Sequence, residues 1–284
     1  MTRLSGILEA AAAELEGTSD SPALDAEILL AHVLGRPRGF LRAHADDAVA
    51  PADHERFRSL LARRLAGEPV AYLTGRRGFW SLDLEVDPGV LVPRPETELL
   101  VEIVLDAMAD RPAPQVLDLG VGSGAIAIAL AVEMPSARIT AVDASAAALE
   151  VARRNAARAG VENIEFLQGD WYQALGGGRF DAIVANPPYL AADDPHLPAL
   201  AHEPAGALVA GPTGLEALEK IAAGAPERLR PGGIVILEHG SGQGAAVREM
   251  CARAGLEAIQ TRRDLAGHER ATLARGPARA GASG

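Results

Sequence analysis

The chain has 284 residues, 48% of them hydrophobic, which is enough to bury a sizeable core in one or two domains. Its formal net charge of −11 argues against a broad nucleic-acid-binding surface, because such surfaces depend on clustered Lys and Arg. The single cysteine, Cys251, excludes an internal disulfide framework, and no apolar run is typical of a signal peptide or a membrane span. We therefore expect a cytoplasmic protein with no membrane partner.

Residues 1–75 have the periodicity of helices. Ser21-Pro22 and Ala50-Pro51 predict helix starts, because proline is favoured in the first helical turn. Apolar side chains recur at three- and four-residue spacing over residues 4–11, 24–31 and 57–65. This part of the chain is predicted to be a small all-helical domain.

Residues 76–95 are expected to link this domain to the next. Residues 79–86 alternate between apolar and polar, and Asp87-Pro88-Gly89 is a turn signal before the apolar run Val90-Leu91-Val92. We predict a β-hairpin linker with its turn at residues 87–89.

Residues 96–276 are expected to form the second domain. From Pro114 onward, β-like runs alternate with helical stretches, which is the pattern of a parallel sheet covered by helices. A loop too short for a helix separates the last two runs, which should pair as an antiparallel hairpin. Strands are expected near residues 115–119, 138–142, 163–168, 180–185, 232–238, 258–261 and 270–273. The polar tail, 277–284, is expected to be disordered.

A glycine-rich turn follows the first of these strands. Gly120, Gly122 and Gly124 let the backbone approach a ligand, which the N–H groups of the next helix would face. Taken alone the pattern is ambiguous, because Gly120-x-Gly122-x-x-Ala125 also fits the loose dinucleotide fingerprint, and a tight turn without a ligand has the same glycines.

Acidic residues end the next two strands. Asp143 lies about twenty residues after the glycines, where a carboxylate can accept hydrogen bonds from both ribose hydroxyls of an adenosine-type ligand. It could at the same time cap the helix ahead of Ser145. Asp170 and Trp171 offer a carboxylate and an indole where an adenine ring would lie, although Trp171 could also be a core residue.

Asn186-Pro187-Pro188-Tyr189 directly follow the fourth strand. Neither proline has an N–H, and the residue before each is kept away from α geometry, so the chain stiffens at the strand tip. A fixed amide side chain and fixed carbonyls then face the cleft in which open α/β sheets bind ligands. Such a corner suits the binding of an NH₂ group.

These four strand ends together resemble the class I S-adenosylmethionine-dependent methyltransferases that act on planar NH₂ groups. A second resemblance, to the HemK-type glutamine methyltransferases of class 1 peptide chain release factors, covers nearly the whole chain. It rests on residues 25–30, Arg63-Arg64, Gly67-Glu68-Pro69, Leu73-Thr74-Gly75, Phe79-Trp80-Ser81, residues 93–98, Leu237-Glu238-His239-Gly240 and Asp264-x-x-Gly267-x-x-Arg270.

The resemblance implies a Rossmann-like domain with a seven-stranded, mostly parallel sheet, preceded by a helical substrate-recognition domain. It implies S-adenosylmethionine as cofactor, S-adenosylhomocysteine as product and a release-factor Gly-Gly-Gln tripeptide as substrate. The residues that it implies for cofactor binding are Gly120, Val121, Gly122, Ser123, Gly124, Asp143, Asp170, Trp171 and Asn186. Those that it implies for substrate binding are Asn186, Pro187, Pro188 and Tyr189. The implied catalytic residues are Asn186, Pro187 and Tyr189. We expect a monomer that does not bind nucleic acid directly.

The corner also suggests how a poorly nucleophilic carboxamide nitrogen would react. Deprotonating an amide lies far outside the pKa range of side chains, so a strong base is not expected. The Asn186 side-chain oxygen and the Pro187 carbonyl can instead each accept one N–H, which orients the nitrogen toward a sulfonium methyl group. Tyr189 is expected to pack its ring against the amide.

Three alternatives remain open at this level: an amino methyltransferase of a DNA or RNA base, a nicotinamide-dependent oxidoreductase, and a non-catalytic adaptor for release factors. No metal site is predicted, because the seven histidines lack ligand spacing. Arg94, Glu96 and Glu98 form either an ion network that braces a cofactor lid or a helix-start cluster. The arginines of residues 36–64 form either a solvated face or part of a grip on the release factor.

Overall fold

The structure, a computed structural model, describes residues 3–277. The chain divides into two compact units, Met1–Arg76 and Arg77–Gly284. Of the tail predicted to be disordered, residues 278–284 lie outside the described residues. Within the described part of the chain, no helix is both long and apolar enough to cross a membrane.

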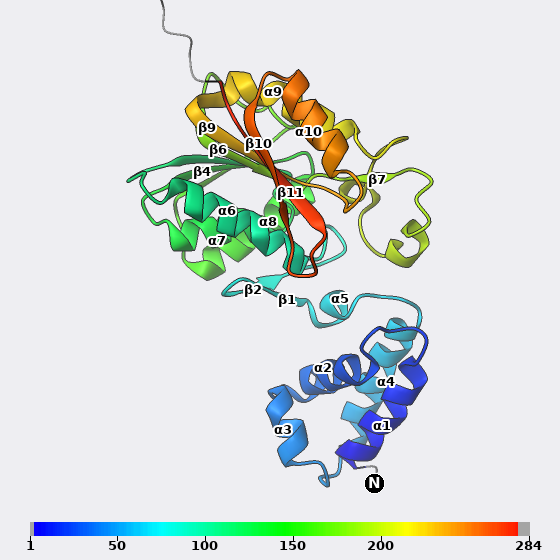
Figure 1. Cartoon of the computed structure of the whole chain (residues 1–284). Helices are drawn as coiled ribbons and strands as arrows, with labels where there is room; N and C mark the ends of the chain where they lie inside the picture. Colours follow the sequence, from blue (N-terminus) through cyan, green and yellow to red (C-terminus); the bar gives the residue numbers. More distant parts are fainter. Residues whose placement is uncertain (1–2, 278–284) are drawn as a thin grey trace, which may run out of the picture. The chain divides into compact units, whose positions relative to one another are not determined.

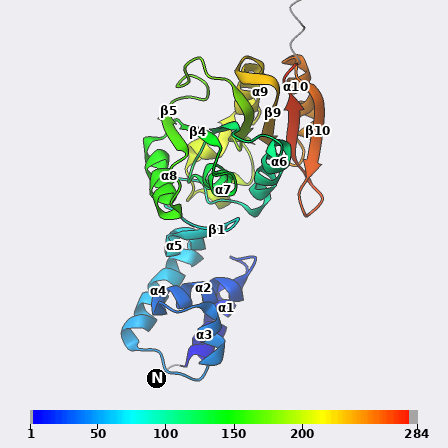
Figure 2. The same cartoon turned by 90° about the vertical axis from the view of Figure 1, so that its left-hand side faces the viewer.

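The first unit is helical. Its elements are α1 (Leu4–Leu15), α2 (Pro22–Leu34), α3 (Arg38–Ala43), α4 (Pro51–Leu65) and α5 (Val70–Thr74). Pro22 and Pro51 are the first residues of their helices, so both predicted helix starts are confirmed. The helix α2 packs against α1 and α4 around fully buried Leu29, Phe57 and Leu61 (Figure 2).

A two-stranded sheet opens the second unit and corrects the predicted hairpin. The strands β1 (Arg76–Phe79) and β2 (Leu82–Glu85) join through Trp80 and Ser81, whereas residues 87–89 are not the hairpin turn and residues 90–92 are not a strand. Trp80 adopts a φ of 56°, which is rare for a large side chain. The turn therefore lacks the Gly, Asn or Asp from which it would have been recognised.

The second unit is built on a seven-stranded sheet in the order β10-β11-β9-β6-β3-β4-β5. The strand β11 alone runs in the direction opposite to the other six strands, and its antiparallel pairing with β10 confirms the terminal hairpin. The strands are β3 (Gln115–Leu119), β4 (Arg138–Asp143), β5 (Ile164–Gln168), β6 (Phe180–Ala185), β9 (Leu229–Glu238), β10 (Glu257–Arg263) and β11 (Glu269–Arg275), and each overlaps its predicted range.

Helices cover both faces of this sheet (Figure 1). On one face lie α6 (Glu98–Met108), α7 (Ala125–Glu133) and α8 (Ala146–Ala159), and on the other α9 (Glu216–Arg228) and α10 (Gly244–Arg253). Side chains of the central strand, β6, point alternately to the two faces of the sheet. Val184 therefore packs beneath α6, α7 and α8, and Ile183 beneath α9 and α10.

Short elements surround the carboxyl ends of the strands and were not predicted. They are η1 (Pro95–Thr97), β7 (Leu190–Ala191), η2 (Leu197–Leu200), η3 (Ala205–Ala207) and β8 (Val209–Gly211). Because β7 and β8 pair with each other, the segment between β6 and α9 is held as a compact excursion.

The order of the strands reverses beside β3, with β4 and β5 on one side and β6 and β9 on the other. Loops that leave such neighbouring strands diverge to opposite faces, and a crevice opens between them. Leu119 lies opposite Ala185 in the register of β3 and β6. The glycine-rich turn and the Asn186 corner therefore begin side by side.

Candidate active site

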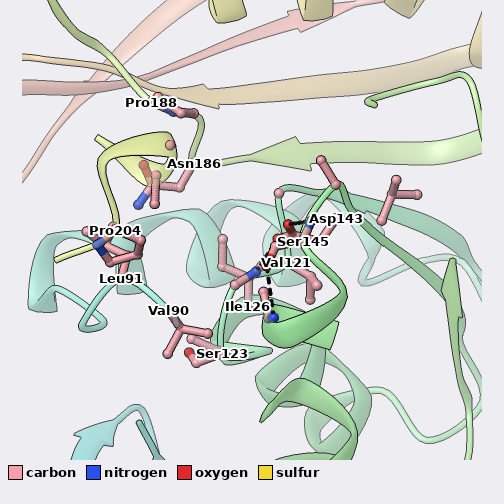
Figure 3. Close-up of a pocket in the computed structure, with 18 of the residues that line it drawn as sticks. Val90, Leu91, Val121, Ser123, Ile126, Asp143, Ser145, Asn186, Pro188 and Pro204 are labelled. Carbon is pink, nitrogen blue, oxygen red and sulfur yellow. Dashed lines mark hydrogen bonds between the residues drawn. The ribbon is translucent and has the colours of Figure 1, made fainter. Parts of the chain in front are cut away.

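A cavity of about 470 Å³ lies beyond the carboxyl ends of β3, β4, β5 and β6. In Figure 3, Asn186 and Pro188 lie toward one end of it, and Asp143 and Ser145 toward the other. Nine of the twelve predicted site residues line it: Gly120, Val121, Gly122, Ser123, Asp143, Asp170, Trp171, Asn186 and Pro188. Gly124, Pro187 and Tyr189 do not.

The glycine turn is held by hydrogen bonds to the neighbouring strand end. Gly120 has a φ of 79° and Gly122 a φ of 53°, conformations that glycine adopts without strain. The Gly122 N–H donates to Asp143 Oδ2 at 2.9 Å. Gly124 caps α7 away from the cavity, and a Cβ there would lie 2.6 Å from Ile128 Cδ1. Its role is therefore close packing rather than ligand contact.

Two backbone donors fix the Asp143 carboxylate. Besides the bond from Gly122, its Oδ1 accepts the Ser145 N–H at 2.9 Å. The N-cap of α8 is Ser145, whose Oγ accepts the Ala148 N–H at 3.2 Å. Each Asp143 oxygen keeps a further lone pair, so both remain able to accept a ligand hydroxyl.

Trp171 joins the cavity to the core. Its ring lies against Gly120, where a Cβ would be 3.5 Å from Trp171 Cζ3, and it packs on the cluster beneath α9 and α10. Its φ of 49° costs roughly 1–2 kcal/mol for a residue with a side chain. Trp171 is therefore part of the cavity wall and also packs on the core, so the two interpretations of this residue are both correct.

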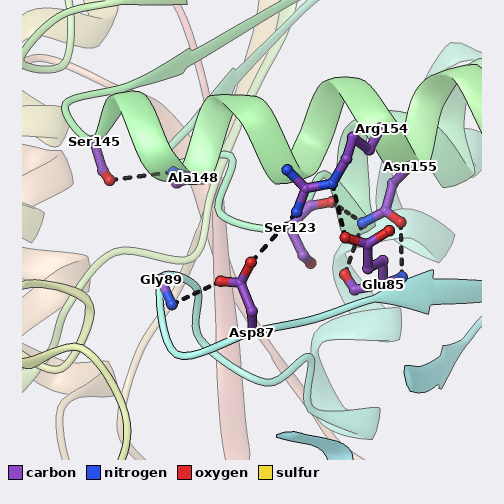
Figure 4. A network of polar contacts seen from close by, with 8 residues as sticks. All are labelled: Glu85, Asp87, Gly89, Ser123, Ser145, Ala148, Arg154 and Asn155. Atoms are coloured by element: carbon purple, nitrogen blue, oxygen red, sulfur yellow. Dashed lines mark hydrogen bonds and ion pairs between the residues drawn. The ribbon is translucent and has the colours of Figure 1, made fainter. Parts of the chain in front are cut away.

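Asn155, which the sequence did not single out, connects α8 to Ser123 at the cavity and to Glu85 in β2 (Figure 4). Its Nδ2 donates to the carbonyls of Ser123 and Glu85, both at 2.9 Å, and its Oδ1 accepts the Glu85 N–H at 2.7 Å. Asn155 is only 2% exposed. The available signal was a polar residue within the buried stripe of a helix.

The neighbouring Arg154 adds an exposed anchor to the same segment. Its guanidinium pairs with Glu85 at 2.7 Å and with Asp87 at 3.3 Å (Figure 4). Asp87 Oδ1 in turn accepts the Gly89 N–H at 2.8 Å. The irregular segment after β2, which supplies Gly89, Val90 and Leu91 to the cavity, is thereby held against α8.

Asn186 is oriented by a residue from another element. Its Nδ2 donates to Thr97 Oγ1 at 3.1 Å, and Thr97 is only 4% exposed. Because the NH₂ end of the amide is engaged by Thr97, Asn186 Oδ1 remains available to accept a hydrogen bond. The sequence predicted the amide but not the hydroxyl that orients it.

Tyr189 lies elsewhere than the sequence suggested. Its side chain packs on the cluster beneath α9 and α10, and burial raises the pKa of its hydroxyl to about 12. Its carbonyl accepts a hydrogen bond from Gln243 Nε2 at 2.9 Å. The tyrosine therefore anchors the corner in the core, and the stacking of its ring on a substrate amide stays a prediction.

Two segments close the remaining side of the cavity. Glu203, 7% exposed, pairs with Arg94, and its Oε2 accepts the Val92 N–H at 3.0 Å. Residues on both sides of this contact line the cavity, including Pro93 and Pro204. Arg94 thus forms an ion pair with Glu203 at the cavity. Glu98 instead accepts the Trp80 N–H at 2.7 Å, and Glu96 is exposed.

Comparison with known proteins identifies the family. The model described as PrmC N-terminal domain matches residues 7–75, and that described as Methyltransferase small domain matches residues 93–203. A release factor glutamine methyltransferase of Bordetella pertussis is 53% identical over 252 residues, covering 88% of this chain and 93% of the relative. That of Escherichia coli is 46% identical over 259 residues, with coverages of 90% and 93%. This chain belongs to the release factor glutamine methyltransferase family.

Solved structures agree on the fold of this family member. A methyltransferase from Pyrococcus furiosus matches with a TM-score of 0.54 and 22% identity, over 76% of this chain and 98% of that chain. A 16S rRNA methyltransferase of Thermus thermophilus, in complex with AdoMet and guanosine, matches with a TM-score of 0.54 and 24% identity, over 71% and 50%. The predicted class I methyltransferase fold is confirmed.

Two carboxyl groups, those of Asp118 and Glu238, are buried near the carboxyl ends of their strands. Burial raises the pKa of Asp118, in β3, and of Glu238, at the end of β9, each to about 7. Asp118 Oδ2 accepts the Ala127 N–H at 3.1 Å. Asp118 Oδ1 and Glu238 Oε2 have no hydrogen-bond partner among residues 3–277. Within the same range, no group of three or more His, Cys, Asp or Glu could hold a metal ion.

Proposed function

We propose that this protein transfers a methyl group from S-adenosylmethionine to the side-chain amide nitrogen of the glutamine in the Gly-Gly-Gln motif of class 1 peptide chain release factors. Membership of the family supports this activity. The single observation that carries it is the oriented amide of Asn186 at one end of a cavity whose other end has the fixed Asp143 carboxylate.

The cavity suits this cofactor in size and chemistry. Its volume of about 470 Å³ is in the range of small-molecule sites. The proposed cofactor contacts are Asp143 for the ribose hydroxyls, Asp170 and Trp171 for the adenine, and the turn from Gly120 to Ser123 for the remainder. When bound, S-adenosylmethionine supplies a methyl group on a positively charged sulfur as the electrophile.

The protein's own part in the reaction is to hold a weak nucleophile. Thr97 accepts a hydrogen bond from the Asn186 NH₂ group, so Asn186 Oδ1 is free to accept one N–H of the substrate amide. The proposed second acceptor is the carbonyl of Pro187, which is next to Asn186 in the chain but does not line the cavity in this structure. Two acceptors at these positions fix the nitrogen and favour its partly positive transition state. After transfer the nitrogen is strongly acidic and loses its proton without a dedicated base.

The segments around Arg94 and Glu203 exclude water from the cavity. Their ion pair brings Pro204, Gly206 and Ala207 to the cavity wall opposite the glycine turn. A less hydrated site strengthens the hydrogen bonds to the substrate amide.

We further propose that the helical unit contributes to release-factor binding. Its arginines do not form a free cationic row: Arg38 pairs with Glu27, Arg58 with Glu14 and Arg64 with Asp25. Deletion of residues 1–70 should weaken release-factor binding and leave cofactor binding intact, and an unchanged affinity would exclude this role.

Mass spectrometry of the release-factor Gly-Gly-Gln peptide after reaction tests the main proposal. We expect one added methyl group on the glutamine side chain, and none when that glutamine is replaced by glutamate. Labelled cofactor incubated with DNA and RNA is the parallel arm, and label in nucleic acid alone would favour a base amino methyltransferase. We expect the protein to act in the cytoplasm as a monomer, with release factor as its partner.

A further inference from the structure

Three side chains from separate elements form a relay behind the substrate end of the cavity. Asn186 Nδ2, after β6, donates to Thr97 Oγ1, in η1, at 3.1 Å. The Thr97 hydroxyl lies close enough to Glu238, the last residue of β9, to lower the pKa of its carboxyl. The two strand ends are neighbours, because Ala185 pairs with Leu237 in the sheet. Glu238 is 1% exposed and does not line the cavity, so it reaches the ligand only through the other two.

The direction of hydrogen bonding in this relay depends on its last member. An ionised carboxylate only accepts hydrogen bonds, so a hydrogen bond between Thr97 and ionised Glu238 uses the one O–H proton of Thr97. The Thr97 oxygen then accepts a hydrogen bond that the NH₂ group of Asn186 donates. A side-chain amide has a donor end and an acceptor end of nearly equal size, and nothing in its shape selects between them.

We propose that Glu238 is a positioning residue for the substrate amide, which acts through Thr97 to hold Asn186 with its acceptor oxygen toward the cavity. This inference rests on the proposed function, which requires an acceptor at that point. Protonation of Glu238 would let its carboxyl donate to Thr97. The relay would then run in reverse, and Asn186 would turn its NH₂ end toward the substrate N–H groups.

The surroundings of Glu238 suit a group that changes charge. Burial raises the pKa of Glu238 to about 7. The Thr97 hydroxyl and the charges of Arg270 and Arg94 lower this pKa, whereas the charge of Glu96 raises it further. Tyr189 also faces it. Both arginines have other partners, Asp264 for Arg270 and Glu203 for Arg94.

The adjacent His239 belongs to a different network. Its ring contacts Thr272 Oγ1 and the Gly240 carbonyl, both at 2.9 Å. Glu238 Oε2 has no hydrogen-bond partner among the described residues.

A spectroscopic test needs no turnover. In the full chain, the side-chain NH₂ resonances of Asn186 are assigned by their loss in Asn186→Asp and followed by NMR from about pH 5.5 to 8.5. We expect a transition near the pKa of Glu238 that disappears in Glu238→Gln and Thr97→Val and persists in Thr97→Ser. Asn186 resonances that do not titrate, or that titrate in the same way in Glu238→Gln, would overturn the proposal.

Kinetics provide the second test. With release factor as substrate at about pH 8, Glu238→Gln and Thr97→Val should lower kcat by about tenfold, with KM and cofactor affinity within about twofold, and Thr97→Ser should restore most of the rate. The wild-type rate should fall as pH drops through about 7, and that of Glu238→Gln should not.

Glu96→Gln is the matched control. It removes a neighbouring carboxylate without touching the relay, so it should keep the wild-type rate at about pH 8 and shift the transition slightly to lower pH. A Glu238→Gln variant with the wild-type kcat and pH profile would refute positioning by Glu238. Absence of methyl transfer by the wild type would instead reject the proposed function, and the NMR titration would still decide whether Glu238 orients Asn186.

Discussion

Glu203 binds Arg94 across 109 positions of the chain and also accepts the Val92 N–H. This one carboxylate therefore fastens the excursion between β6 and α9 to the segment that leads into η1, and both segments line the cavity. The Arg94 side chain is 34% exposed but that of Glu203 only 2%, so the pair is screened less than a surface salt bridge.

Breaking this pair should loosen the closed side of the cavity. Glu203→Gln removes the charge that holds Arg94 while it keeps the size of the side chain, so we expect cofactor affinity to fall by about tenfold. Isothermal titration calorimetry with S-adenosylhomocysteine measures the change. Glu219→Gln, on the exposed face of α9, is the control and should bind normally. Equal affinities for all three proteins would contradict a role for the pair in closure.

Removal of the Asn186 amide should slow the chemical step. Asn186→Ala loses one of the two proposed acceptors for the substrate N–H groups, which we expect to cost ~3 kcal/mol of transition-state stabilisation, or about a hundredfold in rate. Single-turnover methylation of release factor is the measurement. Near-normal turnover would show that the corner does not hold the substrate amide.

The Asp143 carboxylate should matter for cofactor binding more than for chemistry. Asp143→Ala removes the proposed ribose acceptors and also frees the N–H groups of Gly122 and Ser145, so we expect cofactor affinity to fall by at least about tenfold. Calorimetry tests this, with the exposed Asp193→Ala as control. If saturating cofactor failed to restore most of the transfer rate, the assignment of Asp143 to binding would be wrong.

The two neighbours Arg154 and Asn155 should differ sharply in their contribution to stability. Asn155→Ala leaves one buried and two partly buried backbone groups without their partner, which we expect to lower the free energy of unfolding by roughly 2–4 kcal/mol. Arg154→Ala breaks only exposed ion pairs and should cost less than about 1 kcal/mol. Urea unfolding compares the two variants, and similar losses would argue against the anchoring role of Asn155.

The buried carboxyl of Asp118 should make stability depend on pH. Burial raises its pKa from 3.8 to about 7, so between these values the folded chain binds more protons than the unfolded chain, and the free energy of unfolding falls as pH rises. Asp118→Asn abolishes this contribution. The stability of wild type relative to the variant should therefore drop by about 2 kcal/mol between pH 5.5 and 8. Denaturant titrations at both pH values measure it, and a constant difference would contradict the shift.

Most of the fold followed from local patterns. The seven strands of the main sheet overlap their predicted ranges, and the helices that begin at Pro22 and Pro51 were recognised from proline in the first turn. The linker hairpin was misplaced because its turn uses Trp80 in a left-handed conformation, whereas residues 87–89 have typical turn residues but only lead into the cavity wall.

Local sequence patterns predicted only part of the candidate site. The glycines and Asn186 could be recognised because glycine and proline restrict the backbone in characteristic ways. Asn155, Thr97, Glu203 and Glu238 do not, since each is an ordinary polar residue until its partner is known. Tyr189 shows the converse, because a residue next to the corner in sequence turns into the core instead.

Local patterns in the chain predict the order of strands and helices, the glycine turn and the rigid corner at Asn186, because backbone preference and hydrophobic periodicity act over a few residues. Contacts between distant side chains depend on the folded molecule: Asn186 meets Thr97 across 89 positions, and Arg94 meets Glu203 across 109. Such contacts depend on the order and register of the strands, which burial of the whole sheet between its helices determines.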